Sequence, residues 1–141
     1  MPGRWIDQGA IAAIPILEVK TRIDSGKIEV ALKAHVSDKT NWRKMLKNET
    51  ENIDMIEAKN RLLNEIPALI EELDASGVDD DVINIDYPVL QYPSKISSLN
   101  FDKTAAISGV LRGIKGQYLL LENGVLNIRK FGSYHVTLRA L

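Results

Sequence analysis

The longest hydrophobic pattern in the chain runs from residue 52 to residue 75. Apolar side chains recur there every three to four positions, and aspartate and glutamate fill the opposite face. This spacing predicts an amphipathic helix with an acidic outer surface. Because a proline ring removes one backbone donor and clashes with the preceding turn, we expect the helix to break or kink at Pro67. Residues 76–81 (SGVDDD) are typical of a helix end followed by a linker.

The first 48 residues predict a small α/β layer. Its expected elements, in chain order, are a helix over residues 4–13, a strand over 14–22, a helix over 27–36 and a helix over 41–47. We expect Ser25 to cap the second helix, and either Asp38 or Thr40 to cap the third. Trp42 would then lie on the inward face of that third helix.

The chain from residue 82 onward is β in character. Its candidate strands are residues 105–114, 117–121, 125–130 and 134–138. The dipeptide Asn123-Gly124 predicts a tight turn between the second and third of these. Four short strands cannot bury both faces alone, so we expect a small antiparallel β-barrel-like lobe, or a sheet packed on the long helix.

Together these elements predict an α+β protein in three parts. They are an α/β layer over residues 1–48, an acidic amphipathic helix and linker over 49–81, and a β lobe over 82–141. Formal charge changes along the chain in nearly the same places. Residues 1–48 carry nine Lys/Arg against five Asp/Glu, residues 49–86 carry two against twelve, and residues 87–141 carry seven against two.

Two basic blocks therefore flank an acidic one, although the net charge of the whole chain is only −1. A basic surface that faces phosphate would explain this pattern, because each Lys or Arg near a polyanion releases condensed counterions. A solvated acidic helix face packed on a basic one would explain it too. The sequence leaves both interpretations open.

Several kinds of site are excluded by composition. The chain has no cysteine, which removes disulfides, thiolate metal sites and cysteine nucleophiles. It has two histidines and no HExxH, Walker or GxGxxG motif. Residues 113–116 (GIKG) contain two glycines and a lysine, but strands on both sides predict a strand break or bulge there. With no long apolar run and no signal peptide, we expect a soluble cytoplasmic protein without a membrane segment.

Four blocks of the sequence resemble the signature of an uncharacterised bacterial family, a domain of unknown function. The blocks are residues 4–10 (RWIDQGA), 38–47 (DKTNWRKMLK), 113–119 (GIKGQYL) and 124–130 (GVLNIRK). Members of that family are longer and carry a cysteine-rich, zinc-binding region and a strand hairpin upstream. The resemblance therefore implies that this chain corresponds to the C-terminal half of such a protein.

The order of the early elements is also similar to that in GIY-YIG nucleases. On this resemblance Arg4 corresponds to the catalytic arginine, Glu29 to the metal-binding glutamate and Asn41 to a late asparagine of that family. Glu29 would hold a Mg²⁺ beside the scissile phosphate, and Arg4 would stabilise the transition state. The two tyrosine-bearing motifs of the family have no counterpart here, so we expect no nuclease turnover from this chain.

The favoured hypothesis is a nucleic-acid-associated module, a nuclease-like remnant that binds DNA or RNA. Lys115, Arg129 and Lys130 would contact the phosphate backbone. The alternative is an interaction or scaffold module whose β lobe binds a peptide or its own missing N-terminal half. A third possibility is a working Mg²⁺-dependent phosphodiesterase. If a strand hairpin normally pairs beside residues 14–22, that edge is open here, and we expect the chain to form a homodimer or to aggregate through it.

Overall fold

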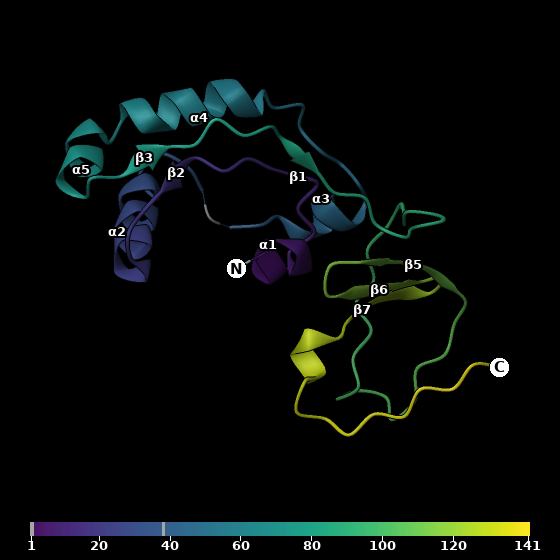
Figure 1. Cartoon of the computed structure of the whole chain (residues 1–141). Coiled ribbons are helices and arrows are strands. Elements are labelled where there is room, and N and C mark those ends of the chain that lie inside the picture. Colours follow the sequence, from purple (N-terminus) through teal and green to yellow (C-terminus); the bar gives the residue numbers. More distant parts are fainter. Residues whose placement is uncertain (1, 38) are drawn as a thin grey trace. The chain divides into compact units, whose positions relative to one another are not determined.

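The computed structural model describes residues 2–37 and 39–141 (Figure 1). The chain forms two compact units, each assembled from segments that are distant in sequence. Unit 1 comprises Met1–Ala10, Asn41–Thr50 and Asp86–Leu141. Unit 2 comprises Ile11–Thr40 and Glu51–Ile85. The α+β class predicted from the sequence is confirmed, because helices and sheets both occur.

Unit 2 is a helical unit with two short strand pairs. Its helices are α2 (Arg22–Leu32), α4 (Met55–Asn64) and α5 (Pro67–Glu72). Strand β1 (Ala12–Ala13) pairs antiparallel with β4 (Ile83–Asn84), and β2 (Leu17–Glu18) pairs antiparallel with β3 (Ser76–Gly77). Its core contains four buried side chains, Ile28, Leu32, Ile66 and Leu73.

Helix α2 begins earlier than the sequence predicts. Thr21 is its N-cap in place of Ser25, and its side chain accepts a hydrogen bond of 3.2 Å from the backbone N–H of Asp24. The extended backbone of Thr21 suits this role, whereas Ser25 lies inside the helix. The helix ends at Leu32, short of the predicted residue 36. The predicted start was wrong because Gly26 is tolerated inside the helix.

The predicted acidic helix is interrupted near Pro67, as expected, and forms two helices. Asp54 caps α4 and accepts hydrogen bonds from the backbone N–H groups of Ile56 and Glu57. Pro67 is the first residue of α5, the helix position where a missing N–H costs nothing. The prediction of a pure linker after this helix was wrong, because Ser76–Gly77 form β3.

Unit 1 is built around a three-stranded antiparallel sheet. Its elements are α1 (Pro2–Asp7), α3 (Trp42–Leu46), β5 (Leu111–Lys115), β6 (Tyr118–Leu121), β7 (Gly124–Asn127) and the 3-10 helix η1 (Arg129–Phe131). The strand order is β5-β6-β7, and the predicted Asn123-Gly124 turn joins the last two. A register shift between Leu111 and Gly113 confirms the predicted irregularity near the glycines.

The predicted barrel was wrong, since the described residues form no closed barrel. Of the four candidate strands, the segments 105–110 and 134–138 are not strands. Both edges of the sheet are nevertheless partly covered. Residues 88–90 exchange backbone hydrogen bonds with β5, and residues 97–99 exchange them with β7. Irregular segments thus pair with part of both edge strands, which protects the edges without closure of the sheet into a barrel.

Two short helices complete unit 1, and both differ from the predicted boundaries. Helix α1 ends at Asp7, where residues up to 13 were expected to be helical. Asn41 caps α3, and its side chain accepts a 3.2 Å hydrogen bond from the backbone N–H of Lys44. Thr40 is therefore not the cap, and Asp38 lies outside the described residues. Within the part of the chain that is described, no helix combines the length and apolar character needed to cross a membrane.

The turn between β5 and β6 lies against the end of α1. Gly116 has a φ of +57°, in the left-handed region, and a Cβ atom there would lie 2.3 Å from the carbonyl oxygen of Asp7. The neighbouring N–H of Gln117 donates a 2.9 Å hydrogen bond to the same oxygen. Only glycine therefore allows this approach of backbone to backbone.

Two glycine substitutions should have opposite effects on stability. Gly116→Ala should lower the urea midpoint of unit 1, because it adds both a clash and an unfavourable φ. Gly26→Ala should raise stability by about 0.4–1 kcal/mol, because a Cβ in α2 meets nothing within 4 Å and alanine favours the helix. Urea unfolding monitored by tryptophan fluorescence and circular dichroism checks both. Equal midpoints for Gly116→Ala and the wild type would contradict the packing described.

Candidate nucleic-acid interface

Formal charge also differs in sign between the two structural units. Unit 1 contains eleven Lys/Arg and five Asp/Glu, a net charge of +6. Unit 2 contains seven Lys/Arg and fourteen Asp/Glu, a net charge of −7. Unit 1 therefore combines the basic residues after position 86 with four of the nine Lys/Arg of the first basic block, and the other five lie in unit 2. A net charge of this size attracts polyanions over distances of about 8–10 Å at moderate salt.

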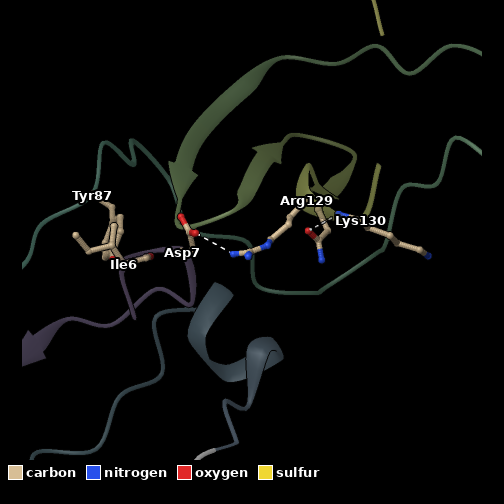
Figure 2. Close-up of polar contacts among 6 residues, drawn as sticks. Ile6, Asp7, Tyr87, Arg129 and Lys130 are labelled. Carbon is tan, nitrogen blue, oxygen red and sulfur yellow. Dashed lines mark hydrogen bonds and ion pairs between the residues drawn. The ribbon is translucent and has the colours of Figure 1, made fainter. Parts of the chain in front are cut away.

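Arg129 and Lys130 lie in η1, directly after β7, and both side chains are exposed. The Arg129 guanidinium is paired with the carboxylate of Asp7 from α1 at 3.0 Å. Figure 2 shows Arg129 pointing toward Asp7 and Lys130 pointing the other way from the same short helix. The backbone N–H of Lys130 donates to the side-chain oxygen of Asn127 at 3.3 Å. These contacts hold the η1 backbone in place and leave the Lys130 ammonium at the surface.

An aromatic and cationic stack lies at the start of α3. The ring planes of Trp42 and Tyr118 are parallel within 4°, with centroids 6.1 Å apart. The guanidinium carbon of Arg43 lies 4.4 Å from the centroid of the indole ring. The sequence predicts that Trp42 lies on the inward face of its helix. It does not predict the contact with Tyr118, because no sequence pattern brings residues 42 and 118 together.

The stack is connected to the η1 segment by hydrogen bonds. The side-chain amide of Asn127 donates to the hydroxyl of Tyr118 at 3.4 Å, and its oxygen accepts from the backbone of Lys130. Burial raises the pKa of Tyr118, although its bonds to Gln117 and Asn127 act in the opposite direction. The hydroxyl therefore stays protonated near neutral pH, and Asn127 lies between the stack and the two basic residues of η1.

Lys115, the third predicted phosphate contact, is buried. Its side chain is 0% exposed, and its ammonium donates to the carbonyl of Met45 at 3.0 Å and to the side-chain oxygen of Asn48 at 3.4 Å. The rings of Tyr92 and Tyr87 lie 5.0 and 5.6 Å from it. Desolvation lowers the pKa of Lys115. This lysine joins β5 to the end of α3 inside unit 1, so the surface that can meet phosphate does not include it.

The three residues expected to mark a catalytic face do not belong to one unit. Arg4 in α1 and Asn41 at the start of α3 belong to unit 1, and both are exposed. Glu29 belongs to unit 2, is exposed on α2, and lies 3.9 Å from the ammonium of Lys33. Each unit by itself therefore holds only part of the predicted arrangement.

The predicted magnesium site at Glu29 lacks supporting ligands. Among the described residues, no group of three or more Asp, Glu or His side chains is placed to hold a metal ion. Magnesium is usually held by one or two carboxylates together with substrate phosphates and water. The charged group beside the Glu29 carboxylate is instead the ammonium of Lys33. The residues present do not fit a built metal centre, and we derive no reaction step through one.

These features define an α+β protein with a basic, partly aromatic unit and an acidic helical unit. The chain belongs to the family described as "Protein of unknown function (DUF2797)", whose family model matches residues 1–136. The predicted membership of an uncharacterised family is thereby confirmed. Comparisons with curated proteins and with solved structures gave no match. The similarity to GIY-YIG nucleases and the bacterial origin stay predictions.

Burial of Lys115 predicts a specific dependence of stability on pH. Its folded-state pKa lies below the unfolded value near 10.5, so between these two values the unfolded state binds more protons and stability rises with pH. Lys115→Met keeps the length of the side chain without the charge and should abolish this rise. Urea midpoints of both proteins from about pH 7 up to the unfolded value near 10.5 check it, because the tyrosines that titrate in this range are common to both proteins. Wild-type and Lys115→Met proteins with parallel pH profiles would contradict the assignment.

Proposed function

We propose that unit 1 binds nucleic acid through phosphate contacts made by its exposed arginines and lysines. The observation that carries the proposal is the charge of unit 1, +6, in a chain whose net charge is −1. Its exposed basic residues, all outside the strands β5, β6 and β7, are Arg4, Arg43, Lys44, Lys95, Lys103, Arg129, Lys130 and Arg139. Such a surface gains affinity for a polyanion chiefly by releasing counterions.

Arg129 is well placed to exchange its carboxylate partner, Asp7, for a phosphate of the nucleic acid. Its ion pair with Asp7 is exposed on both sides, with 66% and 46% of the two side chains accessible. Exposed pairs of this kind contribute about 0–1 kcal/mol, so a phosphate can replace the carboxylate at small cost. Lys130, next to it in η1, is a second exposed cation whose side chain points the other way (Figure 2).

The proposal concerns binding and contains no catalytic step. Arg4 and Asn41 lie in the basic unit and are available to a bound strand, whereas Glu29 lies in the acidic unit. A nuclease-like origin is compatible with this arrangement, but the binding proposal does not depend on it. Whether the ligand is DNA or RNA is decided by the assay below.

The alternative function, protein interaction, is supported by a different observation. Unit 2 has an apolar groove of about 330 Å³, lined mainly by Ile16, Leu17, Val19, Ile28, Leu32 and Val36. Glu29 lies among the residues that line it. In the β lobe, where the peptide was expected to bind, both sheet edges are partly covered by residues 88–90 and 97–99. Contact through the groove would be apolar and insensitive to salt, which separates the two functions.

The salt dependence of binding tests the proposed function. Fluorescence anisotropy with labelled 20-nucleotide DNA and RNA should show affinity falling steeply between 50 and 200 mM salt, on the order of tenfold or more. Arg129→Ala/Lys130→Ala should weaken binding and reduce the slope by about 1.4, since each single-strand phosphate contact contributes about 0.7. Lys20→Ala/Lys27→Ala removes the same charge from unit 2 and is the matched control. Equal losses for both double variants, or salt-independent binding, would count against the proposal.

The ion pair of Arg129 allows a gain-of-affinity test. Asp7→Asn releases the guanidinium and should strengthen binding to the same oligonucleotides by up to about fivefold, the equivalent of an exposed pair. Asp86→Asn removes one negative charge elsewhere in unit 1 and corrects for net charge alone. An affinity unchanged by Asp7→Asn, or raised equally by Asp86→Asn, would show that Arg129 does not take part.

A further inference from the structure

The stack of Arg43, Trp42 and Tyr118 is a feature that phosphate binding alone does not require. Trp42 and Tyr118 are half-buried and pack against the core cluster that contains Met45 and Leu46. The two aromatic rings are thereby fixed in position. Arg43 is exposed, and its guanidinium carbon lies over the indole ring, 4.4 Å from the ring centroid. The basic unit thus holds two aromatic rings packed against its core, with an exposed cation over one of them.

A planar stack of this composition suits the face of an unpaired base. Bases stack on aromatic rings and on guanidinium planes, and each base–aromatic contact contributes about 1–3 kcal/mol by alanine substitution. In a duplex the base faces are occupied by neighbouring base pairs, so they cannot reach a protein side chain without being unstacked. A ring stack at a basic surface therefore distinguishes a single strand from a duplex, whereas phosphate contacts alone do not.

The stack also lies near the basic residues of η1. The Asn127 side chain hydrogen-bonds both to the Tyr118 hydroxyl and to the backbone of Lys130, so this one residue links the stack to η1. Lys44 follows Arg43 in α3 and is exposed. A strand whose base lies on the stack would have cations available for its phosphates on both neighbouring elements.

We infer that unit 1 takes single-stranded nucleic acid in preference to duplex, with one unpaired base added to the stack on its Arg43 side. This inference rests on the proposed function and specifies its ligand. Trp42 and Tyr118 supply the stacking plane, and Arg43 shifts between the indole ring and a neighbouring phosphate. The recognition is independent of base identity, because every base has a π face.

Tryptophan fluorescence provides a direct readout of the stack. The chain has two tryptophans, so Trp5→Phe leaves Trp42 as the only one and serves as the background protein. Titration with a 12-nucleotide oligothymidine should quench Trp42 fluorescence and show binding at least fivefold tighter than to a duplex of the same length, the equivalent of about 1 kcal/mol of stacking.

Two further variants in this background separate stacking from charge and from folding. Trp42→Phe keeps an aromatic ring at this position and should weaken single-strand binding about threefold or more while duplex binding stays unchanged. Because this variant has no tryptophan left, its affinities are measured by fluorescence anisotropy of labelled oligonucleotides. Arg43→Gln removes the cation from the indole ring and should weaken single-strand binding more than Lys103→Gln, the charge-matched control in the same unit. Circular dichroism verifies that each variant is folded.

The outcomes distinguish this inference from the proposed function. Quenching of Trp42 with a preference for the single strand supports the stack as the binding site. Equal affinity for single strand and duplex, without quenching, overturns the inference while salt-dependent binding still supports the proposed function. Absence of binding to both ligands at low salt overturns the two together.

Discussion

Packing of α3 against the three-stranded sheet is the interaction on which unit 1 depends. Leu46 is fully buried, and it shares a core with Met45, Leu120 and Val125. Burial of a leucine of this kind contributes about 1.5–3 kcal/mol, and a five-residue helix has almost no stability without it. Because the same short helix carries Trp42, its packing also fixes the position of the aromatic stack.

The sheet contributes a second constraint through Lys115. A buried ammonium without a carboxylate partner is costly, and here the carbonyl of Met45 and the side-chain oxygen of Asn48 accept hydrogen bonds from it. These acceptors lie at the C-terminal end of α3, where backbone carbonyls point outward and favour a cation. Lys115 therefore specifies how α3 lies on β5, and the adjacent Gly116 allows α1 to approach the same turn.

Local signals in the sequence were sufficient for the features that depend on neighbouring residues. The Asn123-Gly124 turn, the break at Pro67 and the inward face of α3 were all predicted, since each follows from turn chemistry, proline geometry or helical spacing. The burial of Lys115 could not be predicted, because its acceptors lie about seventy positions earlier in the chain. For the same reason Tyr118 was missed, and the division of charge between two units became visible only with the fold.

The fold gathers basic and aromatic groups of distant segments into one unit, for which we propose nucleic-acid binding. Mapping of backbone amide shifts by NMR during titration with a short oligothymidine tests it most directly. The account predicts that shifts concentrate at Trp42, Arg43, Tyr118 and residues 127–130 of unit 1, with unit 2 unchanged. Shifts confined to the apolar groove of unit 2, or none at low salt, would contradict it.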